Sequence, residues 1–67
     1  MITVHINGAS RELAGACSIA QLVEELGFGG RRIALEKNGD IVPRSLYAAE
    51  SVNDGDRLEI VAAVGGG

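Results

Sequence analysis

The chain has 67 residues, of which 46% are hydrophobic and 22% charged, a balance typical of one small globular domain. Its formal net charge of −3 argues against a nucleic-acid partner, and its single cysteine, Cys17, excludes an internal disulfide. Because the sequence has neither an apolar run long enough to span a membrane nor a signal-peptide pattern at its N-terminus, we expect a cytoplasmic protein.

The first elements predicted in chain order form a β-hairpin. Residues 1–6 alternate between apolar and polar side chains, as expected for a half-buried strand. The next two residues, Asn7-Gly8, predict a type I′ turn, which requires positive φ at both positions. Residues 9–13 are then expected to form the returning strand.

A helix is predicted over residues 19–26. Ser18 and Gln21 have the spacing of a capping box at its start, and Gly27 is expected to end it in a left-handed conformation. Four apolar residues share one face of this helix: Ile19, Leu22, Val23 and Leu26.

The middle of the chain is expected to form a second hairpin. Residues 33–37 are predicted to be a strand, and Asn38-Gly39 its turn. Residues 41–42 begin the return. Pro43 has no N–H to donate, so this return should be a short strand at the edge of the sheet.

The last strand is predicted over residues 56–64, after a helical turn at 45–50 and a tight turn at 53–56. One face of this strand carries apolar residues: Leu58, Ile60, Ala62 and Val64. The other face carries Arg57, Glu59, Val61 and Ala63. The apolar Val61 and Ala63 on this second face leave two interpretations open: a partly covered second side of the sheet, or a contact strip for a partner enzyme.

The chain ends in Gly65-Gly66-Gly67, directly after the last strand. Glycine has no Cβ, so this tail should be flexible and thin enough to enter a narrow channel. Its end is the α-carboxylate of Gly67, which is ionised at neutral pH. Such a tail suits a carrier that a partner enzyme activates, although terminal glycine runs also occur at frayed chain ends.

The order of elements predicts an α+β fold in which one main helix covers one face of a mixed sheet. The first and last strands are both regular and apolar, so we expect them to lie adjacent and parallel at the sheet centre. The last strand would then project the tail from a rigid base. This is a β-grasp, ubiquitin-like arrangement, with one domain over residues 1–67 and a flexible tail at 65–67.

The remaining candidate residues favour packing over chemistry. His5 and Cys17 could in principle form a nucleophilic pair, but His5 is predicted on the polar side of a strand and Cys17 beneath the helix start. One cysteine and one histidine are too few for a typical zinc site, so no metal is expected. Arg31-Arg32 is interpreted as a solvated pair.

Three blocks of the sequence resemble the ThiS family of sulfur carrier proteins in thiamine biosynthesis. They are residues 1–4 with Asn7-Gly8, residues 38–44, and residues 54–61 leading to residues 64–67. The resemblance as a whole extends over the full length of the chain. The middle block, Asn-Gly-Asp-Ile-Val-Pro-Arg, is the most particular, because the di-glycine end is shared with ubiquitin and with the molybdopterin carrier.

This resemblance implies a protein co-substrate without catalytic activity or bound cofactor of its own. An E1-like, ThiF-like adenylating enzyme would use ATP to adenylate Gly67. Sulfur from a cysteine desulfurase would convert it to a thiocarboxylate, which a ThiG-like thiazole synthase would use to form thiazole phosphate. The partner-binding residues would be Gly65, Gly66, Val64, Val61 and Ala63.

Other functions remain open at the level of the sequence. They include a molybdopterin-type or cysteine-biosynthesis sulfur carrier, a carrier shared between pathways, a ubiquitin-like protein modifier, and an interaction module with an inert tail. Carrier and modifier would share the activation step and differ in the nucleophile that attacks the acyl group, which is sulfur in one case and lysine in the other.

Overall fold

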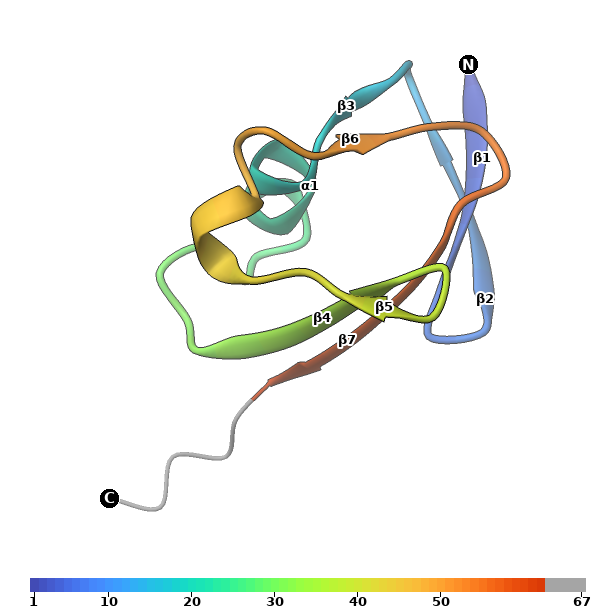
Figure 1. Cartoon of the computed structure of the whole chain (residues 1–67). Coiled ribbons are helices and arrows are strands. Elements are labelled where there is room, and N and C mark those ends of the chain that lie inside the picture. Colours follow the sequence, from blue (N-terminus) through green and yellow to red (C-terminus); the bar gives the residue numbers. More distant parts are fainter. Residues whose placement is uncertain (63–67) are drawn as a thin grey trace.

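The computed structural model describes residues 1–62, which form a five-stranded mixed sheet with one main helix (Figure 1). The sheet order is β2-β1-β7-β4-β5. The strands of this sheet are β1 (Ile2–Ile6), β2 (Ala9–Leu13), β4 (Ile33–Lys37), β5 (Asp40–Ile41) and β7 (Arg57–Ala62). The other elements are α1 (Ile19–Glu25), the 3-10 helix η1 (Arg44–Leu46), and a two-stranded ladder of β3 (Cys17–Ser18) and β6 (Ser51–Val52).

The first and last strands are neighbours and run parallel, as the sequence predicts. His5 of β1 is paired with Arg57 of β7, and Ile6 with Leu58. On its other side β7 pairs antiparallel with β4, in a register that runs from Ile33 opposite Ala62 to Lys37 opposite Leu58. β7 is therefore the central strand of the sheet, and the α+β, β-grasp prediction is confirmed.

Both predicted Asn-Gly turns adopt the backbone conformation that a type I′ hairpin requires. Asn7 and Gly8 have φ values of 52° and 84°, and Asn38 and Gly39 have 52° and 89°. Each turn connects antiparallel strands, β1 with β2 and β4 with β5. β5 is short and lies at the sheet edge, as Pro43 indicates.

The helix is capped at both ends by its own sequence. The Gln21 N–H donates to Ser18 Oγ at 3.1 Å, and the Ser18 N–H donates to Gln21 Oε1 at 2.9 Å, completing the capping box. Gly27 has φ 85°, and the Phe28 N–H donates to the Val23 carbonyl, as in a Schellman motif. The α-helix ends at Glu25, one residue before the predicted end, because Leu26 is the C-cap.

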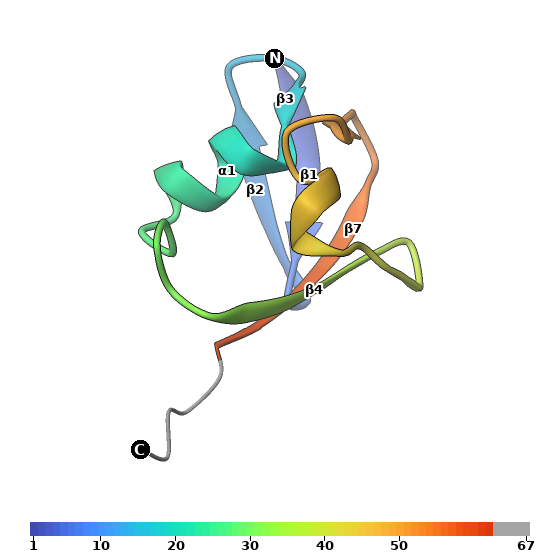
Figure 2. The ribbon, with the colours of Figure 1, turned by 60° about the vertical axis from the view of Figure 1, so that its left-hand side comes forward.

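The helix lies across one face of the sheet (Figure 2), and the hydrophobic core lies between the two. Ile19 and Leu22 of α1 are fully buried against residues from the central strands. The buried hydrophobic residues are Val4, Leu13, Ile19, Leu22, Val23, Leu35, Val42, Tyr47, Val52, Leu58 and Ile60. No polar side chain of the described residues is buried, so hydrophobic packing dominates this small core.

The structure differs from the sequence prediction in its shorter elements. The ladder between β3 and β6 was not predicted. The helical turn expected at 45–50 is the 3-10 helix Arg44–Leu46, and the return strand is Asp40–Ile41. Val42 is buried, and its N–H still donates to the Leu35 carbonyl of β4. Within the described part of the chain, no helix is long and apolar enough to cross a membrane.

Candidate functional site

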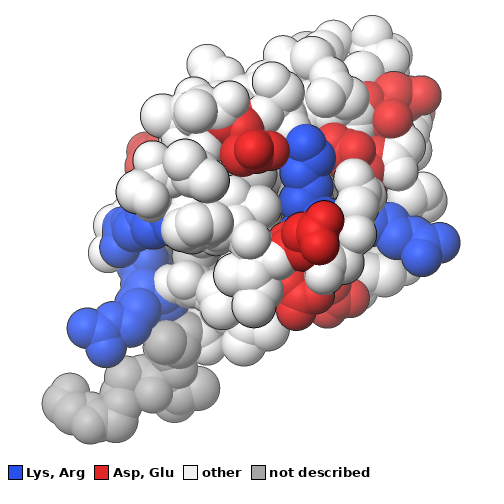
Figure 3. All heavy atoms as spheres, viewed as in Figure 1, with Lys and Arg blue, Asp and Glu red and all other residues white. Residues whose placement is uncertain are grey.

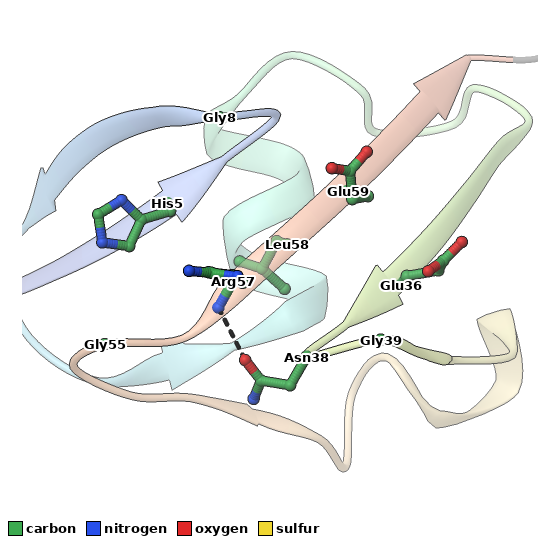
Figure 4. Close-up of a pocket in the computed structure, with 9 residues that line it drawn as sticks. All are labelled: His5, Gly8, Glu36, Asn38, Gly39, Gly55, Arg57, Leu58 and Glu59. Atoms are coloured by element: carbon green, nitrogen blue, oxygen red, sulfur yellow. Dashed lines mark hydrogen bonds between the residues drawn. The ribbon is translucent and has the colours of Figure 1, made fainter.

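The last strand, β7, is held from both sides by the side chains of the two turn asparagines. Asn7 Nδ2 donates to the Ile60 carbonyl at 3.0 Å, and the Ile60 N–H donates to Asn7 Oδ1 at 2.8 Å. On the opposite side the Arg57 N–H donates to Asn38 Oδ1 at 2.9 Å (Figure 4). These bonds extend the pairing of β7 beyond the backbone ladders and make the strand a firm base for the chain that follows it.

The start of β7 is fixed by Asp56. Its carboxylate accepts from the Asn53 N–H at 2.8 Å and from Asn38 Nδ2 at 3.1 Å, and it lies 3.9 Å from Lys37 Nζ. Burial alone would raise the pKa of Asp56, but the two hydrogen bonds and the nearby Lys37 charge outweigh it, so this pKa is lowered. Asp56 is therefore ionised at neutral pH and bridges the two turns that precede β5 and β7.

The sheet face opposite the helix is uncovered near the end of β7. Val61 is 62% exposed, whereas its neighbours Leu58 and Ile60 on the other face are buried. The residue paired with Val61 across β4 is Ala34, which is also exposed. A second layer therefore does not cover Val61 within residues 1–62, and this small apolar surface is available for contact.

Further back along β7 the same face carries polar and charged side chains around a hollow (Figure 4). His5 projects from β1, Arg57 and Glu59 from β7, and Glu36 from β4, and all four are exposed. Glu36 and Glu59 are directly opposite in the register of the two strands. The arrangement is an open polar surface of mixed charge, which suits contact with another macromolecule better than enclosure of a small substrate.

His5 and Cys17 do not meet. His5 lines the hollow on the open face, and Cys17 lies in β3 and packs against the hydrophobic core. Burial, followed by the charge of Glu25, raises the pKa of the Cys17 thiol, which keeps it protonated at neutral pH. The residues that sequence analysis considered as a nucleophilic pair therefore lack the geometry for it.

The described residues hold no group of three or more His, Cys, Asp and Glu side chains that could bind a metal ion. The other predicted site residues, namely Ala63, Val64, Gly65, Gly66 and Gly67, lie outside the described residues. Of the predicted partner surface, the structure thus describes Val61. Sequence reasoning missed the asparagine contacts to β7, because residues 7 and 60 are joined only by the fold.

A mixed sheet whose parallel first and last strands lie side by side, with one helix across one face, defines a β-grasp protein of the ubiquitin-like class. The sequence model of the ThiS family matches residues 4–67. The chain belongs to the ThiS family.

Solved structures agree with this assignment. The crystal structure of the thiamine biosynthesis protein ThiS from Geobacter metallireducens superposes with a TM-score of 0.85 and 26% identity, covering 98% of this chain and 100% of that chain. The solution structure of a thiamine biosynthesis protein from the same organism superposes with a TM-score of 0.81 and 26% identity, covering 98% of this chain and 88% of that chain.

Curated relatives are of two lengths. A thiazole synthase of Paramagnetospirillum magneticum is 50% identical over 62 residues, which are 92% of this chain and 19% of that protein. The uncharacterized protein ycf40 of Porphyra purpurea is 36% identical over 98% of this chain and 93% of its own length. The chain thus spans about a fifth of the thiazole synthase and nearly the whole of ycf40.

Proposed function

We propose that this protein is a sulfur carrier of thiamine biosynthesis whose Gly67 carboxylate becomes a thiocarboxylate. The observation that carries the proposal is the match to the ThiS family over residues 4–67, a range that includes all three terminal glycines. The fold supports it, because the chain enters this tail from β7, the central strand of the sheet.

The proposed chemistry takes place at the Gly67 carboxylate. A carboxylate oxygen attacks the α-phosphate of ATP in an adenylating enzyme, pyrophosphate leaves, and an acyl-adenylate forms. The terminal sulfur of a persulfide, supplied by a cysteine desulfurase, attacks the acyl carbon and AMP leaves with the oxygen. A thiol then cleaves the sulfur–sulfur bond and releases the thiocarboxylate. The carrier contributes the reacting carboxylate and acts as a co-substrate, and ATP binds to the partner.

A thiazole synthase is the proposed recipient of the sulfur. Two thiazole synthases, from Paramagnetospirillum magneticum and Magnetococcus marinus, contain a region similar to this chain that makes up 19% and 20% of their lengths. Fusion of a carrier-like region to a synthase supports a working association between the two. In this protein the association would be between separate chains or domains, and the thiocarboxylate would deliver sulfur for thiazole phosphate formation.

The proposed contact surface begins at Val61 and Ala34 and continues along the last five residues. Glycine residues lack the Cβ that would widen the chain, so Gly65 to Gly67 suit a narrow channel. Ordering them costs about 1–2 kcal/mol of backbone entropy per residue, so affinity must come from the folded body. The exposed Val61 is the described apolar side chain best placed to supply part of it.

Carrier-dependent pyrophosphate exchange by the adenylating enzyme tests the proposal. Gly66→Val should still bind this enzyme but not be adenylated, because the new Cβ would meet the channel wall. Deletion of Gly67 should abolish exchange because the carboxylate no longer reaches the nucleotide. The thermal midpoint of both variants should equal that of the wild type, since the core lies within residues 1–62. Wild-type exchange by the Gly67-deleted chain would overturn the proposal.

A further inference from the structure

Two adjacent arginines lie at the end of the sheet where β7 ends. Ile33, the first residue of β4, is paired with Ala62, the last residue of β7. Arg31 and Arg32 immediately precede Ile33, and both are exposed. The fold thus places this basic pair beside the point where the chain continues from Ala62 toward the tail. The space-filling view shows basic side chains gathered at this end of the molecule (Figure 3).

Neither arginine forms an ion pair with a carboxylate of the described residues. Among residues 1–62, the ion pairs within 4.0 Å are those of Lys37 with Glu50 and Asp56. Arg31 is instead held over the Phe28 ring, at 5.7 Å from its centroid, and its N–H donates to the Phe28 carbonyl. In a chain with a net charge of −3, two of the six basic residues are therefore concentrated beside the base of the tail.

We propose that Arg31 and Arg32 form a basic docking patch that contacts acidic side chains on the rim of the channel that admits the tail. The inference rests on the proposed function and adds the charge of the partner surface to it. Complementary charge at a rim raises the association rate and orients the incoming protein. Here it would bring a carrier of net negative charge to its partner with the tail facing the channel.

The position of the pair favours a protein rim over the nucleotide as its contact. Gly67 lies five residues beyond Ala62, and five extended residues span about 17 Å. A carboxylate drawn to the nucleotide would therefore be far inside the channel while the arginines stay at its mouth. Phosphate groups at the reaction centre are out of their reach, whereas carboxylates at the entrance are within it.

The test is the kinetics of pyrophosphate exchange by the purified adenylating enzyme, with the full-length carrier titrated at saturating ATP. The double variant Arg31→Glu, Arg32→Glu should raise KM for the carrier about tenfold or more and leave kcat unchanged. Raising the ionic strength should raise KM of the wild type and have less effect on KM of this variant. The conservative double variant Arg31→Lys, Arg32→Lys should keep most of the affinity.

Two controls separate docking from folding. Arg11→Glu makes the same change in charge as the single variant Arg32→Glu, but on β2 at the far edge of the sheet, and should not alter KM. Arg32→Glu alone leaves the contact of Arg31 with Phe28 intact and should raise KM without a change in thermal midpoint.

The outcomes distinguish the two proposals. Equal KM values for wild type, Arg32→Glu and the double variant would overturn the docking patch and leave the carrier function standing. A KM increase in Arg11→Glu as large as that in Arg32→Glu would also overturn the docking patch, because the effect would then be one of overall charge. No exchange with the wild type would refute the proposed function, and the docking patch with it.

Discussion

At the scale of single residues, two asparagines each have two structural roles. Asn7 and Asn38 both adopt positive φ in a hairpin turn, and the side chain of each also bonds to the backbone of β7. The sequence shows the first role, because Asn-Gly is a local signal. The sequence does not show the second role, because the bonded partner is 53 positions from Asn7 and 19 positions from Asn38.

Replacing Asn7 with glycine should separate these two roles. Glycine keeps the positive φ of the turn, but the N–H and carbonyl of Ile60 lose their partners, so the free energy of unfolding should fall by about 1–3 kcal/mol. Asn7→Asp keeps the acceptor and loses the donor, so its free energy of unfolding should lie between those of Asn7→Gly and the wild type. Urea denaturation measures all three. Equal stability of the glycine variant and the wild type would show that the side chain does not hold β7.

Asp56 should make stability depend on pH. The folded-state pKa of Asp56 is lowered, so its contribution is full above the unfolded pKa of about 3.9 and is lost as pH falls through the folded pKa. Asp56→Asn should therefore be less stable than the wild type at neutral pH and lose less stability on acidification from about pH 5 to pH 2. Denaturant melts across this range measure the difference, with the exposed Glu12→Gln as control. If the free energy of unfolding of Asp56→Asn varied with pH as that of the wild type does, Asp56 would not be the source of this pH dependence.

At the scale of elements, local signals predicted the helix and both hairpins, and the regular apolar pattern of the first and last strands predicted the parallel pairing of β1 with β7. The capping box, the Asn-Gly turns and strict alternation each specify a conformation through nearby residues. The ladder of β3 and β6 was not predicted, because each of its strands has only two residues and therefore no periodic pattern. It pairs Cys17 with Val52 and Ser18 with Ser51. At the candidate site, Val61 was singled out by its alternation, and its exposure required the structure.

The helix should contribute to stability mainly through its buried face. Leu22 is fully buried, so Leu22→Ala should lower the free energy of unfolding by about 2–5 kcal/mol. That is a large part of the total for a small domain, about 5–15 kcal/mol. Glu24→Ala, on the exposed side of the same helix, is the matched control and should have little effect. Similar losses in the two variants would contradict this account, because alanine favours the helix at both positions and only Leu22 is buried.

At the scale of the whole molecule, the core lies within residues 1–62, whereas the proposed chemistry takes place at Gly67. The helix and one face of the sheet form the core, the other face is open, and the chain leaves the sheet from its central strand. The proposed chemistry therefore depends on the terminus and on the surfaces beside it, and the core provides rigidity. A side chain that packs in the core should then be replaceable without loss of sulfur transfer.

Cys17 provides that test. It packs against the core, and the pKa of its thiol is raised, so we expect Cys17→Ala to accept sulfur as the wild type does. Thiocarboxylate formation in a reconstituted system with adenylating enzyme and desulfurase is the measurement, with a thermal melt to confirm folding. A folded Cys17→Ala protein that forms no thiocarboxylate would assign Cys17 to the chemistry.

The most direct test of the carrier function is the intact mass of the protein isolated from its native cells, followed by fragmentation of its C-terminal peptide. The proposal predicts a population in which sulfur replaces one oxygen, with the change located at Gly67. A branched adduct that joins Gly67 to a lysine of another protein would indicate a modifier instead. An unaltered terminus in thiamine-starved cells that make thiazole would contradict the sulfur-carrier account.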